Sequence, residues 1–211
     1  MHVGNLQDFK RAGQLLNAWG ERFKRHAQPH VWRVLWHIMC HTRGLGQVDA
    51  GARFGALADA LERARPITIA RLQGGAYGGA ADLTLACDFR LGVRGMRFFM
   101  PAARFGLHYY PSGLRRYTQK VSPSFAKRAF LLSEDFSDED LLRVGYLDWL
   151  VDRSEFAKKV DEVATRLAGL APLSMSNMKR AIEQFAQAEP DIPKIRDGIR
   201  QCQTSDDLRE G

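Results

Sequence analysis

Apolar side chains near the middle of the chain change their spacing at a cluster of glycines. A short β-branched run after Pro66 predicts a strand over residues 67–72. From Ala80 the apolar residues recur at helical spacing through Cys87, which predicts a tightly packed helix. The two are joined by a turn that contains four glycines, Gly74, Gly75, Gly78 and Gly79. Such a turn exposes backbone N–H groups at the positive end of a helix dipole, where they bind an oxygen that is or becomes negative.

The residues around the turn limit which kind of ligand can supply that oxygen. A phosphate-binding loop places Lys and then Ser or Thr after its last glycine, whereas this chain continues with Ala80 and Ala81. A dinucleotide-binding turn needs Gly-x-Gly-x-x-Gly, and a motif that starts at Gly74 fails at Ala76. A glycine turn can also serve only to pack a helix closely against a strand. The local pattern leaves these interpretations open.

The remaining pattern predicts mainly helices around a few short strands. Two strands are expected over residues 89–93 and 97–100, followed by a long loop over residues 101–113. Ser137 is expected to cap a helix that has acidic residues in its first turn and ends at Gly145. Residues 31–40 fit either a buried helix or a strand. Further helices are predicted over residues 9–23, 50–65, 125–132, 156–170 and 174–186, with a last helix opened by Pro190 and Pro193.

The composition is that of a chain with one sizeable core. Its 211 residues are 45% hydrophobic and 26% charged, and no apolar run is long enough to cross a membrane. Three widely spaced cysteines indicate reduced thiols, and no secretory signal is recognisable, so a cytoplasmic location is expected. The net charge of +7 is spread along the chain and is interpreted mainly as a solvated surface, although such a charge also attracts nucleic acid or an anionic cofactor.

Most histidines lie in the first part of the chain, and four of them form two pairs. His26 and His30 are four residues apart, as are His37 and His41, a spacing that on a helix can hold a metal ion. Neither pair has the glutamate of a His-Glu-x-x-His motif, and no Cys-x-x-Cys motif accompanies them. The sequence therefore predicts no metal site.

The glycine turn and its helix, from Gln73 to Asp88, resemble a segment of the crotonase (enoyl-CoA hydratase/isomerase) superfamily, Asn-Gly-x-Ala-x-Gly-Gly-Gly-x-Glu-Leu-Ala-Leu-Ala-Cys-Asp. Residues 98–106 are similar to its Phe-Gly-x-Pro-Glu-x-x-x-Gly pattern, and Arg116 falls at the arginine of its Thr-Gln-Arg-Leu. Later family segments are similar to residues 137–151, 172–182 and 205–211. The likeness covers about residues 65–211. Residues 1–60 lack the family's opening strands and its Ala-Gly-x-Asp-Leu-like motif.

The resemblance implies an α/β fold, a crotonase-like spiral of ββα units with a C-terminal helical layer and an incomplete or divergent N-terminal part. It divides the chain into an atypical, partly helical segment over residues 1–60, an α/β core over residues 61–170 and C-terminal helices over residues 171–211. In the family those helices build the oligomer. A homotrimer or a dimer of trimers is therefore the expected assembly.

The resemblance also implies roles for single residues. Gly79 stands where the family has the glycine whose N–H binds the thioester oxygen in an oxyanion hole and so stabilises an enolate. No separate cofactor is implied, because coenzyme A enters as part of an acyl-CoA substrate. The substrate-binding positions carried over in the same way are Tyr77, Gly78, Gly79, Ala102 and Gly106.

The acid and base of the reaction are less clear from the resemblance. Hydratases of the family use two glutamates, and these positions hold Asp82 and Ala102 here. Asp82 keeps a carboxylate, which can alternatively serve only to offset the helix dipole, whereas Ala102 has no titratable group. His108 and Tyr109 lie on the same predicted loop, and Tyr109 matches a tyrosine of methylmalonyl-CoA-type decarboxylases of the family. Both are candidate catalytic residues, with packing as the alternative role.

The expected function is that of an acyl-CoA-processing enzyme of fatty acid metabolism, a hydratase-like lyase or an isomerase, that stabilises a thioester enolate at Gly79. One alternative is decarboxylation or other enolate chemistry that uses His108 and Tyr109. The other is a catalytically degenerate relative that binds acyl-CoA or, as the less favoured partner, RNA, which some crotonase relatives bind.

Overall fold

Two small sheets form the centre of the structure, a computed structural model that describes residues 47–205. The first sheet is parallel throughout, in the order β1-β3-β6, and consists of β1 (Ile69–Leu72), β3 (Phe89–Val93) and β6 (Trp149–Val151). In the second, β4 pairs in parallel with β2 and antiparallel with β5. That sheet consists of β2 (Ala76–Tyr77), β4 (Arg97–Phe99) and β5 (Asp135–Ser137).

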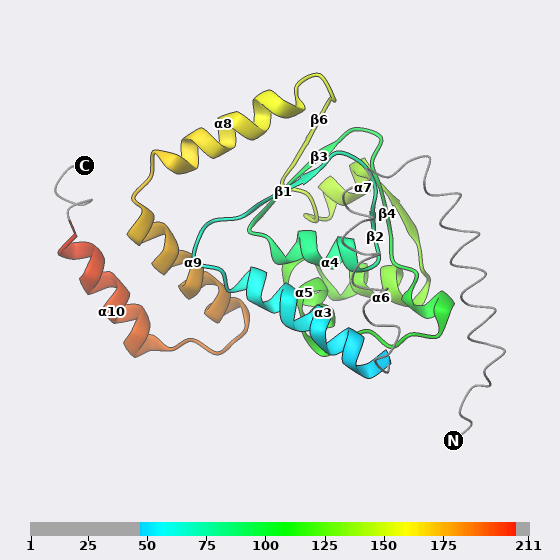
Figure 1. The fold of residues 1–211 in the computed structure, drawn as a ribbon, viewed down its shortest axis with the longest axis horizontal. Coiled ribbons are helices and arrows are strands. Elements are labelled where there is room, and N and C mark those ends of the chain that lie inside the picture. Colours follow the sequence, from blue (N-terminus) through cyan, green and yellow to red (C-terminus); the bar gives the residue numbers. More distant parts are fainter. Residues whose placement is uncertain (1–46, 206–211) are drawn as a thin grey trace.

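Helices pack below the two sheets and also extend to one side of them (Figure 1). The helices beside the sheets are α3 (Gln47–Glu62), α4 (Gly79–Ala86), α5 (Pro111–Lys120), α6 (Pro123–Leu131) and α7 (Asp138–Arg143), with the short 3₁₀ helix η1 (Ala102–Phe105). The helices that extend away are α8 (Phe156–Ala168), α9 (Pro172–Ala186) and α10 (Ile192–Gln203). The resulting α/β arrangement agrees with the predicted fold class.

The aromatic part of the core lies between the second sheet and the helices α5 and α6, and the rest of the core comes mainly from α4 and the first sheet. Phe98 of β4 is fully buried, whereas its neighbour Arg97 points to solvent, as the alternation of a strand requires. The ring of Phe98 lies within 5.1–6.2 Å, centroid to centroid, of four other rings, mostly in edge-to-face geometry. These rings belong to Tyr117, Phe125, Phe136 and Tyr146.

Local signals in the sequence fix the ends of several helices. Ser122 caps α6 by accepting a hydrogen bond from the N–H of Phe125 at 3.1 Å. Ser137 and Asp140 form a reciprocal capping box at the start of α7, as the sequence predicts for Ser137. Gly145, with φ of 78°, follows the end of α7 in the left-handed conformation that favours glycine.

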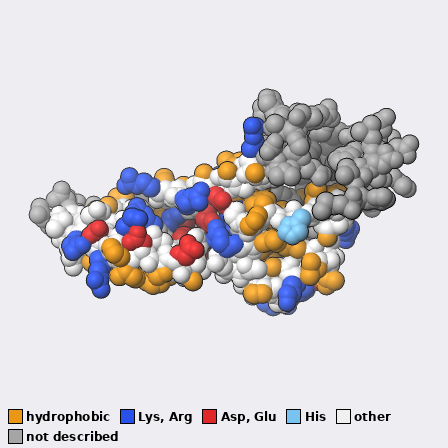
Figure 2. Space-filling model, turned by 90° about the horizontal axis from the view of Figure 1, so that it is seen from below, with side chains coloured by type: hydrophobic (Ala, Val, Ile, Leu, Met, Phe, Trp, Pro, Cys, Tyr) orange, Lys and Arg blue, Asp and Glu red, His pale blue; other side chains and the backbone are white. Residues whose placement is uncertain are grey.

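The outer helix α9 is tied to the first sheet by one lysine. Lys179 Nζ donates to the carbonyl of Pro66 at 3.0 Å and to Asp88 Oδ2 at 2.7 Å. The same Asp88 oxygen accepts hydrogen bonds from the N–H and the hydroxyl of Thr68, just before β1. None of the residues of α9 is buried, so its attachment depends on surface contacts such as this one and the ion pair of Glu183 with Lys120. The C-terminal helices carry exposed apolar side chains among charged ones (Figure 2), including Met178, Ile182 and Phe185 of α9.

Most of the predicted elements are confirmed, with one correction in the middle of the chain. The loop predicted over residues 101–113 instead contains η1 and the first residues of α5, which begins at Pro111. Proline suits the first position of a helix because it has no N–H to leave unpaired and its φ is already helical. The helices predicted within residues 1–46 lie outside the described residues. None of the described helices is long and apolar enough to cross a membrane.

Candidate functional site

The glycine turn delivers a free backbone donor at the start of α4. Gly78 adopts φ of 54° and ψ of −125°, a conformation that favours glycine, and its N–H donates to the carbonyl of Phe99 at 3.0 Å. Gly79 is the first residue of α4, so its N–H has no partner within the helix. Among the described residues that N–H has no other acceptor. The turn therefore presents one N–H at the positive end of a helix dipole.

Gly79 also has a packing role that the sequence did not reveal. A Cβ at this position would lie only 2.8 Å from Cζ of Phe54 on α3, closer than side chains approach one another. The Phe54 ring in turn makes an edge contact with the ring of Tyr110, with centroids 5.9 Å apart. Gly79 therefore offers an N–H and also lets α3 pack closely against α4, a contact between two helices rather than the helix–strand packing that the sequence left open.

Asp82, one turn further along α4, is fully buried and ion-paired. Its Oδ1 accepts from Nε of Arg116 at 3.1 Å, and its Oδ2 accepts from Nη2 of the same guanidinium at 2.7 Å. Oδ2 also accepts a hydrogen bond from the hydroxyl of Tyr110. Asp82 and Arg116 both have no exposed side-chain surface. A bidentate pair of this kind fixes the orientation of the two side chains as well as pairing their charges.

Three further helices contribute charges to the same buried group. Nη1 of Arg116 donates to Asp59 at 2.6 Å and lies 3.4 Å from Glu62 Oε2, both on α3. Burial raises the pKa of Asp59, but hydrogen bonds from Arg116 and Ser112 together with the positive charges of Arg116 and Arg63 outweigh it and lower that pKa below its usual value. Glu62 also pairs with Arg115 and with Lys120, and Lys120 lies 3.2 Å from Glu183 of α9. This buried ion network joins α3, α4, α5 and α9.

Tyr109 and Tyr110 stack on each other next to the ion network, with ring centroids 4.5 Å apart. Burial and then the Asp82 carboxylate raise the pKa of Tyr110, which keeps its phenol protonated as a donor. Burial, and again Asp82, raises the pKa of Tyr109 well above its ordinary value. The Tyr109 hydroxyl makes no hydrogen bond of good geometry with the described residues, although the Tyr110 hydroxyl is close by. His108 is exposed, and its Nδ1 lies 2.8 Å from the carbonyl oxygen of Tyr109.

The other predicted binding residues lie on the neighbouring strand and on η1. Tyr77 is in β2, opposite Phe99 of β4, and burial followed by Asp135 raises its pKa. Ala102 is buried in η1 and Gly106 ends that helix with φ of 65°. Ala102 offers no proton donor or acceptor in its side chain, so among the carried-over positions only Asp82 holds a carboxylate.

The sequence singled out Gly79 and Asp82 but did not indicate what they contact, which is Phe54 for Gly79 and Arg116 with Tyr110 for Asp82. A local signal existed for the ion network, because Asp82 lies on an otherwise small and apolar helix. A carboxylate among Ala81, Leu85 and Ala86 is rarely buried unless it is paired. That signal predicts a cationic partner but does not identify it.

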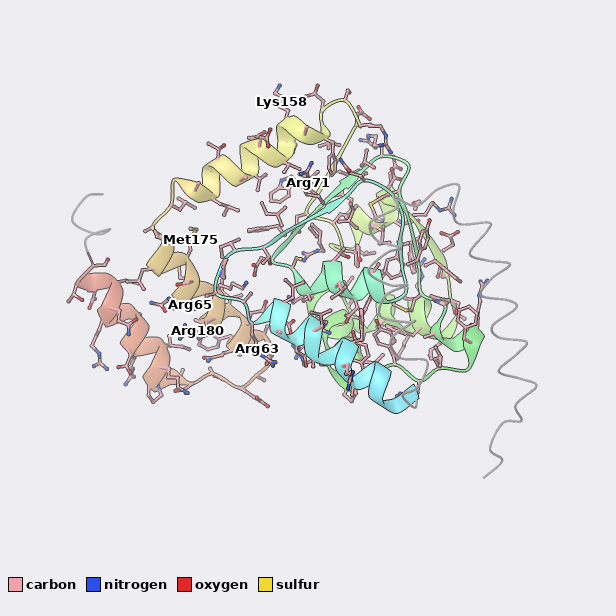
Figure 3. All side chains as sticks on the ribbon, in the orientation of Figure 1. Arg63, Arg65, Arg71, Lys158, Met175 and Arg180 are labelled. Atoms are coloured by element: carbon pink, nitrogen blue, oxygen red, sulfur yellow. The ribbon has the colours of Figure 1, made fainter. Side chains whose placement is uncertain are left out.

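Four exposed arginines lie away from the glycine turn, and we refer to Arg63, Arg65, Arg71 and Arg180 together as the basic face, although Arg71 stands apart from the other three. Figure 3 shows Arg63, Arg65 and Arg180 near α9 and the end of α3, with Arg71 nearer to α8. Within residues 47–205, Arg65, Arg71 and Arg180 form no ion pair with a carboxylate, and Arg71 instead lies over the ring of Phe156 at 5.8 Å. The same residues contain no cluster of three His, Cys, Asp or Glu side chains suited to a metal ion. The four paired histidines lie outside the part that is described.

Comparison with known proteins gives one consistent result. Residues 39–209 match the sequence profile of the family described as enoyl-CoA hydratase/isomerase. A short-chain-enoyl-CoA hydratase of Clostridium acetobutylicum is 27% identical over 145 residues, which are 67% of this chain and 56% of the relative. A carnitinyl-CoA dehydratase of Salmonella typhimurium is 27% identical over 147 residues, 70% of this chain and 54% of the relative. The chain therefore spans little more than half the length of these two relatives.

Solved structures show the same fold. The crystal structure of an enoyl-CoA hydratase/isomerase family protein from Hyphomonas neptunium superimposes with a TM-score of 0.73 at 24% identity. The match covers 77% of this chain and 63% of that one. At this level of identity the likeness concerns the fold, and it agrees with the crotonase-like α/β architecture that the sequence predicted.

Proposed function

The chain belongs to the enoyl-CoA hydratase/isomerase family, and on this premise we propose that it binds an acyl-CoA thioester and stabilises the enolate at Gly79 as a hydratase-like lyase. In hydration, the oxygen of water bonds to the β-carbon of an enoyl thioester while one proton of that water leaves to solvent, and the π electrons of the Cα–Cβ double bond move to the thioester oxygen. The α-carbon then takes up a proton. The N–H of Gly79 would bind the oxygen that becomes negative, and one such donor contributes about 3 kcal/mol in comparable sites.

The observation on which this proposal depends is the N–H of Gly79. It begins α4, has no acceptor among the described residues and lies at the positive end of the helix. The family relationship supplies the ligand, because the two relatives named above act on CoA thioesters according to their names.

The contact with Phe54 decides how the N–H is best tested. In a Phe54→Ala background, Gly79→Ala adds a Cβ and keeps the N–H, whereas Gly79→Pro adds a ring and removes it. Proline is tolerated at the first position of a helix, so both variants are expected to fold. We expect acetoacetyl-CoA, an enolate-like ligand, to bind the proline variant about 100-fold more weakly than the alanine variant in titration calorimetry.

Two results would contradict this prediction. Equal affinities of the alanine and proline variants would mean that the N–H of residue 79 does not contribute to binding of acetoacetyl-CoA. A wild-type protein that binds no acetoacetyl-CoA would contradict the acyl-CoA function altogether. If that protein instead binds RNA with an affinity that falls steeply with salt, the basic face of Arg63, Arg65, Arg71 and Arg180 would become the functional surface.

A second candidate reaction is decarboxylation, and the burial of Asp82 favours it. Loss of CO₂ breaks a carbon–carbon bond and sends the electron pair to the thioester oxygen, so it needs an oxyanion donor but no base. Asp82 is enclosed by Arg116 and Tyr110, and Ala102 has no titratable group. Release of CO₂ from a carboxylated acyl-CoA that depends on Tyr109 in a Tyr109→Phe variant would support this reaction over hydration.

We also propose that the chain assembles as a homo-oligomer, most simply a trimer, through α9. Met178, Ile182 and Phe185 follow each other at steps of four and three on this helix, so they share one face, and all three are more than half exposed. We expect Ile182→Glu to reduce the molar mass measured by light scattering to that of a monomer. Leu131→Glu is a matched control, since Leu131 is 72% exposed on α6. A wild-type monomer would contradict the proposal.

A further inference from the structure

Asp82 is enclosed by its partners, and both of its carboxylate oxygens are engaged by them. Both of its oxygens accept hydrogen bonds from Arg116, at 3.1 Å and 2.7 Å, and the second oxygen also accepts one from Tyr110. Its side chain is fully buried, so water does not reach it either. A general acid or base needs a hydrogen-bond path to the reacting atom, directly or through one water. The observed contacts of Asp82 offer no such path.

The charge balance around Arg116 also opposes proton uptake by Asp82. Arg116 is fully buried and stays protonated, so it needs the carboxylates that surround it. A neutral Asp82 would leave this guanidinium with Asp59 at 2.6 Å and Glu62 at 3.4 Å, and Glu62 already faces Arg115 and Lys120. The pair is therefore suited to remain ionised throughout a reaction.

The position of Asp82 in α4 gives the pair another role. Asp82 lies three residues after Gly79, so one turn of helix connects the ion pair to the free N–H. We propose that Asp82 is a positioning residue, which fixes the first turn of α4 through Arg116 and so aims the Gly79 N–H at the thioester oxygen without transferring a proton. This inference rests on the proposed function, because it assigns the N–H the role of oxyanion donor.

A double-mutant cycle tests the role of the pair. Asp82→Asn leaves the buried guanidinium short of one negative charge, whereas Asp82→Asn with Arg116→Met removes both charges together. In the double variant Glu62 keeps its pairs with Arg115 and Lys120, and Asp59 is partly exposed to water. For a positioning residue, we expect Asp82→Asn to bind acetoacetyl-CoA at least about tenfold more weakly, and the double variant to return to within about threefold of wild type. If Asp82 were a general acid or base, Asp82→Asn would bind this ligand as wild type does, and turnover would be lost in both variants.

Hydrogen exchange of residues 78–86 supplies a readout that does not depend on the ligand. A positioning role predicts faster exchange in this segment for Asp82→Asn and recovery in the double variant. Asp88→Asn is the matched control, because Asp88 follows α4 and pairs with Lys179 at 2.7 Å but lies at the other end of that helix. We expect Asp88→Asn to lower stability without weakening acetoacetyl-CoA binding.

Each outcome bears on one of the two proposals. A wild-type protein that does not bind acetoacetyl-CoA contradicts the proposed function, while exchange at residues 78–86 still decides whether Asp82 fixes this turn. Wild-type binding and exchange in Asp82→Asn would overturn the positioning role, as would a folded double variant that fails to recover. If Asp82→Asn alone does not fold, a folded double variant with near-wild-type binding supports the role.

Discussion

The two flanks of α4 are held by different kinds of interaction. On the flank toward α3 and α5, the buried charges of Asp82 and Arg116 face each other with no exposed surface on either side chain. On the other flank, the neutral hydroxyl of Tyr146 donates to the carbonyl of Ala81 at 2.8 Å and lies 2.6 Å from the hydroxyl of Thr84. Thr84 also approaches the same carbonyl, at 2.9 Å.

The two flanks differ in the cost of removing one partner of the interaction. A lost charge leaves its buried partner uncompensated, and in a buried pair this costs several kcal/mol. A lost hydroxyl leaves a neutral acceptor that a second hydroxyl can still satisfy, at a smaller cost. The charged flank therefore holds α4 in one orientation and tolerates little change, whereas the neutral flank tolerates more.

The largest expected effect comes from breaking the charged flank. Arg116→Met leaves Asp82 without its cation, and we expect the free energy of unfolding in urea to fall by about 3–5 kcal/mol. Arg97→Met is a matched control, because Arg97 makes a similar two-pronged contact with Asp135 at 2.7–3.0 Å but both side chains are about half exposed. That variant should lose less than about 1 kcal/mol. Equal losses would mean that burial does not distinguish the two pairs.

A smaller effect is expected on the neutral flank. Tyr146→Phe removes the hydroxyl that bonds Ala81 and Thr84, which should cost about 1–3 kcal/mol in the same urea experiment. Tyr117→Phe is the control, since the Tyr117 hydroxyl is equally buried but has no hydrogen-bond partner in residues 47–205. Its removal should be neutral or slightly stabilising. A loss for Tyr117→Phe as large as for Tyr146→Phe would contradict the assigned hydrogen bonds.

The smallest expected effect is a pH dependence of stability that comes from Tyr146 on the neutral flank. Burial raises the pKa of Tyr146, so above pH of about 10 the unfolded chain loses this proton while the folded chain keeps it. Fewer protons on the unfolded state make stability fall as pH rises, by up to about 1.4 kcal/mol per pH unit for one tyrosine. The stability advantage of wild type over Tyr146→Phe should therefore shrink by about 1 kcal/mol between pH of about 10 and 11. An advantage that stays constant over this range would contradict the raised pKa.

Part of the fold follows directly from the sequence. The β-branched run before the glycines, the helical spacing after Ala80 and the cap at Ser137 act through neighbours in the chain, and the structure confirms them. The strands β2, β5 and β6 have two or three residues each and form through pairing with distant strands. Pro111 and Gly113 were interpreted as loop residues, but Gly113 is buried in α5, where a Cβ would lie 2.4 Å from the Tyr109 ring.

In the candidate site, too, the sequence predicted some features, whereas others depend on residues far apart in the chain. The family resemblance is confirmed, and the match begins at residue 39, upstream of the predicted start near residue 65. The roles assigned to Gly79, Asp82, His108 and Tyr109 remain predictions. The sequence did not indicate that Arg116, 34 residues after Asp82, encloses that carboxylate. It also did not separate the exposed His108 from the half-buried Tyr109 next to it, whose hydroxyl is covered, because burial depends on what packs from other elements.

The contact of Lys179 has a consequence for the order of folding. Lys179 lies 113 residues after Pro66 and 91 residues after Asp88, and these two partners stand just before β1 and β3. Its two acceptors come together only once those parallel strands have paired, so α9 docks after the sheet has formed. Because no residue of α9 is buried, little energy holds it in place afterwards. We therefore expect α9 to join the fold after the parallel sheet and to leave it early in unfolding.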